Sequence, residues 1–319
     1  MIQAFAGLEP HFAAVEQHMA QALRADELRV DRLIAELGTF HGKMLRPALI
    51  LLVARALGPI DDIHTRLGAA LEMIHTATLI HDDLIDDADV RRGLPTAHVT
   101  FGNTTSVLLG DYFYTHAFSL VAAARLPDVM QRLVETTNVI CRGELHQQCA
   151  ERDAALTEAE YERIIFGKTA CLTELAAEFG AVHGTLAQRE AAAAYGLACG
   201  MAFQIVDDCL DFTGDPAKVG KTLATDIERG RMTLPILRLL AAASPAERVE
   251  HERHLQRQGT PDEVAAFRAT VVNSGALTSA LATAKDHVRR AQSALSAFPA
   301  GEARDQLSVL AEFIVARDF

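Results

Sequence analysis

The chain has 319 residues, a net charge of −12 and a hydrophobic content of 50%, while tryptophan is absent and aromatic residues make up 6%. The acidic balance argues against nucleic acid as a partner. The longest apolar run, residues 48–54, is far shorter than the ~20 residues of a membrane-spanning helix, so no transmembrane segment is expected. Because the N-terminus has neither a basic flank nor a long apolar region, we expect a cytoplasmic protein.

The hydrophobic pattern predicts an all-α fold. Apolar residues recur three and four positions apart, as in Leu67, Leu71 and Ile74, and strand signals are missing. Neither a linker nor a change in composition divides the chain, so residues 1–319 are interpreted as a single domain. Breaks between helices are expected at residues 38–42, 58–59, 93–95, 127, 180–184, 214–220, 244–245, 259–261 and 299.

The five cysteines are odd in number, lack CxxC spacing and fall within helical stretches, which predicts reduced core residues. They are Cys141, Cys149, Cys171, Cys199 and Cys209.

The first chemical signal along the chain is basic. Gly42-Lys43-Met44-Leu45-Arg46-Pro47 opens a helix with Lys43 and Arg46 at i,i+3, near a helix N-terminus where backbone N–H groups also favour phosphate. His75 follows in the next apolar helix, two turns before the first aspartate of an acidic segment.

That acidic segment is the most informative stretch of the chain. Residues 79–87 place Asp82, Asp83, Asp86 and Asp87 in an otherwise apolar helical run. Asp82 and Asp86 stand at i,i+4 on one helical face, roughly 6 Å apart between their Cβ atoms, where two anions repel unless a cation lies between them. Hard oxygen ligands in this arrangement suit Mg²⁺, whose shell is completed by water and phosphate oxygens.

A second acidic segment repeats this spacing. Asp207 and Asp211 stand at i,i+4 in the apolar run 204–211, with Asp208 beside the first of them. One such motif is weak evidence because surface helices often carry charge runs, but two copies in apolar helices require paired charges or metal. If the two helices face each other, their aspartates form a pocket for Mg²⁺ ions that bridge a diphosphate.

Basic residues follow each acidic region. Arg91 and Arg92 follow the first segment by a few residues, Lys168 precedes Thr169 in an apolar stretch, and Lys221 follows the second segment. In a chain of net charge −12, this placement suggests two phosphate sites, one bridged by metal and one held by Lys, Arg and His side chains.

These residues together resemble the trans-isoprenyl diphosphate synthases of the polyprenyl synthetase family, in order and spacing and over nearly the whole chain. The matching motifs are Gly42-Lys43-x-x-Arg46-Pro47, His75, Asp82-Asp83-x-x-Asp86, Arg91-Arg92-Gly93, Gly110-Asp111, Gly167-Lys168-Thr169-Ala170, Phe203-Gln204-x-x-Asp207-Asp208-x-x-Asp211, Gly220-Lys221 and Thr233-Leu234-Pro235.

The resemblance implies an isoprenoid synthase type I fold, which is a bundle of antiparallel helices around a deep central pocket. It also implies a homodimer, the assembly that family members commonly form. It also implies condensation of isopentenyl diphosphate with an allylic diphosphate, such as farnesyl or geranyl diphosphate, with about three Mg²⁺ ions per active site. The implied metal residues are Asp82, Asp86 and Asp207, supported by Asp83, Asp208 and Asp211. The implied ligands of the allylic diphosphate are Arg91, Lys168 and Lys221. The implied ligands of isopentenyl diphosphate are Gly42, Lys43, Arg46, His75 and Arg92. By the same resemblance, Thr169 and Gln204 would stabilise the carbocation.

The chain departs from the family pattern after Lys221. Thr222 and Ala224 replace the Pro and Gly that the family often has there, and Arg231 stands where a second Lys is common. Arg keeps the charge but is a broader, forked donor, so Arg231 is also expected to bind substrate.

Product length is predicted from the helix before the first acidic segment. With Asp82 at the pocket mouth, Thr78, Ala77 and Ile74 line the wall at about 5–11 Å depth, since one helical turn rises 5.4 Å. Short-chain family members have a bulky aromatic at the Ala77 or Thr78 position, or an insertion in the first motif, and this chain has neither. We therefore expect a product of roughly C30–C50, with a C15–C20 synthase as the alternative.

Two other classes compete with this interpretation. A class I terpene cyclase shares the first aspartate motif but needs no isopentenyl site, so Lys43, Arg46 and Arg92 argue against it. A non-catalytic subunit of a heteromeric prenyl synthase normally lacks some of the six aspartates, and all six are present.

Overall fold

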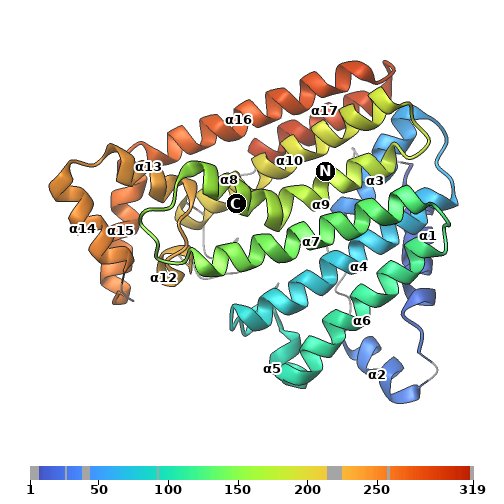
Figure 1. The fold of residues 1–319 in the computed structure, drawn as a ribbon, viewed down its shortest axis with the longest axis horizontal. Helices are drawn as coiled ribbons and strands as arrows, with labels where there is room; N and C mark the ends of the chain where they lie inside the picture. Colours follow the sequence, from blue (N-terminus) through green and yellow to red (C-terminus); the bar gives the residue numbers. More distant parts are fainter. Residues whose placement is uncertain are drawn as a thin grey trace. The chain divides into compact units, whose positions relative to one another are not determined.

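The structure is a computed structural model that describes residues 7–25, 27–37, 44–91, 93–213, 225–256 and 259–316. Helices form almost all of its regular structure (Figure 1), and the predicted all-α class is confirmed.

The chain divides into two compact units, which are described one at a time. The first consists of Met1–Glu135, Leu175–Ala193 and Ala297–Leu307, and the second of Thr136–Glu174, Ala194–Ser296 and Ser308–Phe319. The single-domain organisation expected from the sequence stays a prediction.

The helices of the first unit are α1 (Glu9–Ala22), α2 (Leu28–Glu36), α3 (Leu45–Leu57), α4 (Asp62–Ile85), α5 (Ala97–Phe101) and α6 (Asn103–Ala122). The helices of the second unit are α8 (Glu158–Ile165), the π-helix η2 (Phe166–Ala170), α12 (Thr225–Arg229), α13 (Leu234–Ala242), α14 (Pro245–Leu255), α15 (Pro261–Asn273) and α16 (Ala276–Ala294). Residues of both units occur in α7 (Pro127–Cys149), α9 (Cys171–Gly180), α10 (Leu186–Thr213), the 3₁₀-helix η3 (Leu295–Ala297) and α17 (Glu302–Val315).

Helix α4 is the centre of the first unit. It contacts α1, α3, α5 and α6, and the side chains of Leu67, Leu71 and Ile74 on it are fully buried. A capping box starts the helix, because Asp61 Oδ1 accepts a hydrogen bond from the His64 backbone N–H at 3.3 Å and the His64 ring accepts one from the Asp61 backbone N–H at 3.2 Å. An all-round apolar surface is what a helix surrounded by other helices requires.

In the second unit, α13 packs against α8, α14, α15 and α16. Its apolar side chains, such as Ile236 and Leu240, are buried. Three neighbouring helices start at Thr or Ser residues followed three positions later by Glu, which is the sequence pattern of a capping box. These pairs are Thr157 with Glu160, Ser244 with Glu247, and Thr260 with Glu263.

The expected helix breaks are largely confirmed. Helices end at Leu57 and Gly180, and others begin at Pro127, Pro245 and Pro261. The breaks predicted at residues 38–42 and 214–220 lie outside the described residues.

The expectation that strands are missing is wrong at one place. Val90–Arg91 (β1) and Leu94–Pro95 (β2) form an antiparallel hairpin, in which Val90 pairs with Pro95 and Arg91 with Leu94. Gly93 has a φ of +79°, a left-handed conformation that glycine adopts without steric cost. Strands of two residues are too short to show an alternating hydrophobic pattern.

All five cysteines are free, but the prediction that all are core residues is wrong for Cys141 and Cys149. Both are exposed on α7, whereas Cys171, Cys199 and Cys209 are buried. A helical location does not distinguish the inner from the outer face of an amphipathic helix.

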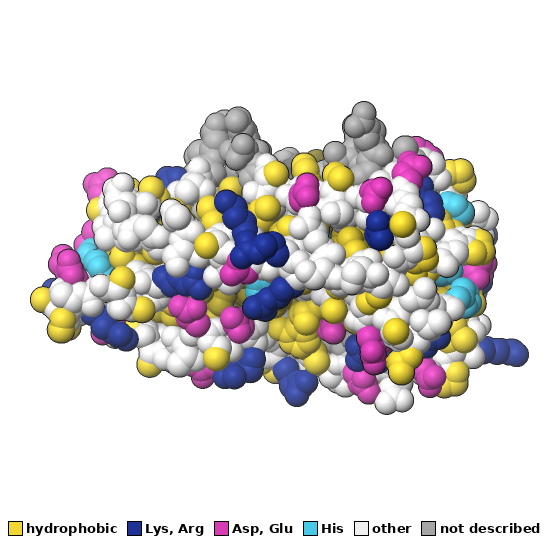
Figure 2. All heavy atoms as spheres, turned by 90° about the horizontal axis from the view of Figure 1, so that it is seen from above, with side chains coloured by type: hydrophobic (Ala, Val, Ile, Leu, Met, Phe, Trp, Pro, Cys, Tyr) yellow, Lys and Arg dark blue, Asp and Glu magenta, His cyan; other side chains and the backbone are white. Residues whose placement is uncertain are grey.

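On the molecular face drawn in Figure 2, acidic and basic side chains are interspersed, with apolar groups between them. Among the described helices, none combines the length and the apolar character that crossing a membrane requires.

Two glycines set the distance between α7 and η2. A Cβ atom added to Gly143 would lie 2.8 Å from the Gly167 backbone, and one added to Gly167 would lie 2.7 Å from Gly143 Cα. The two backbones therefore touch, and the residues that follow these glycines are brought together.

We predict that Gly143→Ala lowers the free energy of unfolding by about 1–3 kcal/mol, because the new methyl group overpacks a backbone contact. Chemical denaturation followed by circular dichroism measures the change. Gly58→Ala is the matched control, since a Cβ atom there meets nothing within 4 Å. Equal stability of the two variants would contradict the assigned contact.

Candidate functional site

The first acidic segment lies at the C-terminal end of α4. The helix ends at Ile85, and Asp86 caps it by donating its backbone N–H to the Asp82 carbonyl at 2.7 Å. This bond preserves the helical i,i+4 relation of Asp82 and Asp86, both of which are half-buried. The predicted helical spacing is thus present, although Asp86 is the capping residue and no longer part of the helix.

Asp83 points into the protein. Its side chain is 2% exposed and forms an ion pair with Arg91, whose Nη2 lies 2.6 Å from Oδ1. Arg91 Nε donates to both carboxylate oxygens, at 2.7 and 2.9 Å. Arg91 is half-buried in strand β1. A residue predicted to support metal and a residue predicted to bind phosphate therefore form an ion pair with each other.

The second acidic segment, on α10, has the same division. Asp207 and Asp211 are half-buried, whereas Asp208 is 6% exposed. Asp208 accepts hydrogen bonds from the Tyr161 hydroxyl at 2.7 Å and from Gln204 Nε2 at 2.8 Å. Burial, together with the negative charge of Asp226, raises the pKa of Asp208 to about 8.

Gln204 links Asp208 to Thr169. The Thr169 hydroxyl donates to Gln204 Oε1 at 2.6 Å, while the amide nitrogen of Gln204 bonds to Asp208. Both ends of the Gln204 amide are therefore fixed, and the two residues predicted to stabilise a carbocation are in contact. Thr169 lies in η2, and a π-helical turn inside an α-helical stretch is frequent at functional sites.

Lys168, also in η2, forms an ion pair with Glu144 of α7, with 3.1 Å between Nζ and Oε2. Glu144 and Lys168 directly follow the two glycines that let α7 and η2 touch. No sequence motif pointed to Glu144, and the signal that could have found it is the presence of a glycine in the interior of each of the two helices. Tyr161 was missed for a different reason, since a buried tyrosine in α8 is ordinary core until its partner is known.

Asp211 and Arg231 are joined through Asp226. The Asp226 backbone N–H donates to Asp211 Oδ2 at 3.1 Å, and Arg231 Nη1 lies 3.4 Å from Asp226 Oδ1. Arg231 thus neutralises charge next to the second acidic segment.

The other predicted residues are located as follows. Arg46 lies in the first turn of α3 and His75 on α4, and both are half-buried. Ile74 and Ala77 are fully buried, whereas Thr78 is half-buried and donates its hydroxyl hydrogen to the His75 carbonyl at 2.8 Å. Gly42, Lys43, Arg92 and Lys221 lie outside the described residues.

The donor set fits a hard divalent cation. Asp82 and Asp86 in one unit, and Asp207 and Asp211 in the other, are half-buried carboxylates at i,i+4, the oxygen ligands that Mg²⁺ and Ca²⁺ prefer. Asp83 and Asp208 are buried and bond to Arg91 and to Tyr161, respectively. An all-α scaffold with two such motifs agrees with the class that the sequence resembles, isoprenoid-forming enzymes that act on diphosphates.

Comparison with known proteins establishes the family. The polyprenyl synthetase family model matches residues 29–271, and the chain belongs to this family. The chain is 34% identical to the octaprenyl diphosphate synthase of Haemophilus influenzae, over 98% of this chain and 95% of that protein. It is 36% identical to a short chain isoprenyl diphosphate synthase of Methanothermobacter thermautotrophicus, over 88% of each.

A solved structure supports the fold. A Caulobacter crescentus polyprenyl synthase, complexed with calcium and isoprenyl diphosphate, matches with a TM-score of 0.93 and 36% identity, over 99% of this chain and 97% of that one. The chain thus has the isoprenoid synthase fold and is a prenyltransferase of isoprenoid biosynthesis.

We predict that Tyr161→Phe lowers the rate constant of prenyl transfer about tenfold. Without the Tyr161 hydroxyl, Asp208 is anchored less firmly and holds Gln204 and Thr169 less precisely, which raises the activation free energy by about 1.4 kcal/mol. Steady-state kinetics measure this effect. Tyr195→Phe is the matched control, since Tyr195 is equally buried in the same unit but bonds to Cys199.

A double-mutant cycle separates positioning from a general loss of structure. If Tyr161 acts through the Gln204–Thr169 contact, Tyr161→Phe has little further effect in a Thr169→Ala background. If the two substitutions instead lower the rate constant by independent factors that multiply, Tyr161 does not act through the Gln204–Thr169 contact.

Proposed function

We propose that the chain condenses isopentenyl diphosphate with an allylic diphosphate, such as farnesyl or geranyl diphosphate, head to tail and in trans. The observation that carries this proposal is the division within each acidic motif. In each motif the inner aspartate, Asp83 or Asp208, is buried, while the outer aspartates are half-buried and stand at i,i+4.

About three Mg²⁺ ions would be held by Asp82, Asp86, Asp207 and Asp211. Asp83 and Asp208 would help to orient these ligands. Bound Mg²⁺ supplies charge stabilisation to the departing diphosphate. The calcium and isoprenyl diphosphate named for the Caulobacter relative lend support to this assignment.

The basic side chains bind the substrates. Arg91, Lys168 and Lys221 bind the allylic diphosphate, and Arg231 balances the charge of Asp226. Arg91 and Lys168 are each held by a carboxylate, which fixes their positions before substrate binds. The isopentenyl diphosphate site is formed by Gly42, Lys43, Arg46, His75 and Arg92.

Thr169 and Gln204 stabilise the charge that develops on the allylic carbon. The allylic C–O bond breaks with its electron pair passing to the diphosphate, and the carbocation is attacked by the isopentenyl double bond. The released diphosphate then takes the proton that the adduct loses. The chain contributes no nucleophile, so catalysis rests on electrostatics and positioning.

We further propose a product of roughly C30–C50, with Ile74, Ala77 and Thr78 on the wall of a deep pocket. The name of the Haemophilus relative agrees with this range, whereas the Methanothermobacter relative keeps a short-chain product as the alternative. Residues 1–319 would act as one domain of a cytoplasmic homodimer.

The reaction is tested by incubating the purified chain with labelled isopentenyl diphosphate and farnesyl diphosphate. We expect consumption that requires Mg²⁺ and ends at one product length, read by mass spectrometry. Asp82→Asn should lower kcat by at least about a hundredfold, while Asp87→Asn at an exposed position should have little effect. Unchanged activity of Asp82→Asn would overturn the metal assignment.

Product length is tested separately. We expect Ala77→Phe, and Thr78→Phe at the half-buried neighbour, to shorten the product because an aromatic ring closes the pocket. Ala69→Phe is the control for general overpacking, since Ala69 is equally buried on another face of α4. An unchanged product spectrum for active variants at positions 77 and 78 would refute the pocket model.

A further inference from the structure

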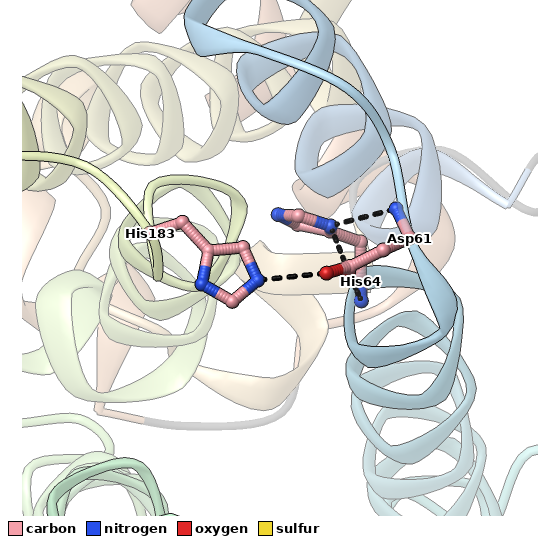
Figure 3. Close-up of side chains that lie close together, drawn as sticks. All are labelled: Asp61, His64 and His183. Carbon is pink, nitrogen blue, oxygen red and sulfur yellow. Dashed lines mark hydrogen bonds and ion pairs between the residues drawn. The ribbon is translucent and has the colours of Figure 1, made fainter.

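Two imidazoles and a carboxylate converge at the start of α4, in the first unit (Figure 3). Asp61 caps the helix, His64 lies in its first turn, and His183 lies just after α9. His183 Nε2 is 2.8 Å from Asp61 Oδ2, and His64 Nδ1 is 2.6 Å from Asp61 Oδ1. One potential ligand atom from each residue lies within 4.8 Å of the others.

The His64 ring has conflicting partners. Nδ1 accepts the Asp61 backbone N–H at 3.2 Å, which needs its lone pair, yet it also lies 2.6 Å from the Asp61 carboxylate, which needs a proton there. A single nitrogen satisfies only one of these demands at a time. Burial lowers the pKa of His64, whose side chain is 3% exposed, and therefore favours the neutral ring that metals bind.

We propose that Asp61, His64 and His183 bind a divalent transition-metal ion of the zinc class. A ligand set of two imidazoles and one carboxylate suits Zn²⁺, whereas Mg²⁺ prefers oxygen ligands alone. The side chains of Asp61 and His183 are 45% and 53% exposed, which leaves a path for the ion and a position for water. Tetrahedral Zn²⁺ needs ligand atoms about 3.4 Å apart, so small side-chain rotations suffice.

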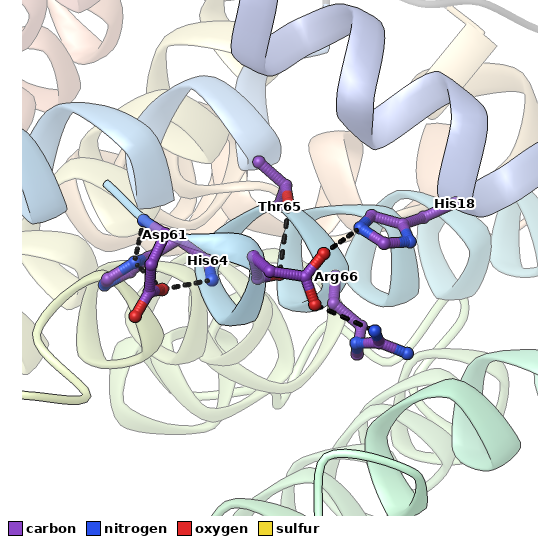
Figure 4. Close-up of polar contacts among 6 residues, drawn as sticks. His18, Asp61, His64, Thr65 and Arg66 are labelled. Atoms are coloured by element: carbon purple, nitrogen blue, oxygen red, sulfur yellow. Dashed lines mark hydrogen bonds and ion pairs between the residues drawn. The ribbon is translucent and has the colours of Figure 1, made fainter. Parts of the chain in front are cut away.

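Among the charges around the cluster, the Asp61 carboxylate is the one that must attract a cation. The neighbouring Asp62 is already paired, with Arg66 at 2.8 Å and with His18 of α1 at 3.0 Å (Figure 4). The N-terminus of α4 bears a partial positive charge that opposes a metal ion. The Asp61 carboxylate must offset that charge, so loss of its charge should weaken the site even where its capping role is kept.

The site is separate from the catalytic one. Asp61 and Asp82 lie at opposite ends of α4, about 30 Å apart at 1.5 Å per residue. The metal would link the start of α4 to the segment after α9, and thereby stabilise the folded state without taking part in catalysis.

The test uses the full chain, stripped with chelator, and Zn²⁺ alone as the probe, with Mg²⁺ in excess throughout. Zn²⁺ is expected to bind in calorimetric titration and to raise the thermal midpoint. His183→Ala should abolish this binding step, and Asp61→Asn should weaken it by at least about tenfold while keeping the helix cap. His116→Ala, a histidine outside the cluster, is the control.

Zn²⁺ that binds elsewhere, for example at cysteines, binds equally to the wild type and to every variant. It therefore does not contribute to the difference between their titrations. Equal stoichiometry and equal thermal shift for the wild type and His183→Ala would overturn the proposal. A loss of the shift in His116→Ala as well would also overturn it, because the effect would then not belong to this cluster.

Discussion

A carboxyl group inside an apolar helix needs a positive partner or hydrogen-bond partners, and this constraint shapes both acidic segments. At each segment one aspartate meets the requirement within the protein: Asp83 with Arg91, and Asp208 with Tyr161 and Gln204. Their neighbours keep half-buried carboxylates. The inner residues thereby fix the helix faces, and the outer ones lie closer to solvent, where the proposed metal ions would reach them.

The residues of η2 depend on the same anchoring. Asp208 orients the Gln204 amide, which in turn accepts from the Thr169 hydroxyl, so a buried carboxyl group determines where a polar group of the π-helix points. Lys168, the residue before Thr169, is placed by packing: the close contact of the Gly143 and Gly167 backbones allows Glu144 to reach it. Electrostatics and close packing thus act on adjacent residues of one turn.

Much of the fold and part of the site could be predicted from the sequence, because the signals are local. Helical periodicity, Gly and Pro breaks and the i,i+4 aspartate spacing all act within one turn or one helix. The Arg91 pair, Tyr161 and Glu144 could not be predicted, since each contact joins separate elements through tertiary packing. The β1–β2 hairpin and the exposure of Cys141 were missed because strands of two residues and helix faces leave little local signal.

The division between inner and outer aspartates is tested most directly by the Mg²⁺ dependence of the prenyl-transfer rate in two variants of adjacent residues. For Asp207→Asn, the account predicts that the Mg²⁺ concentration giving half-maximal rate rises at least about tenfold. For Asp208→Asn, it predicts a lower rate at an unchanged Mg²⁺ midpoint. An equal shift of the midpoint in both variants would contradict the account, because Asp208 would then bind metal as Asp207 does.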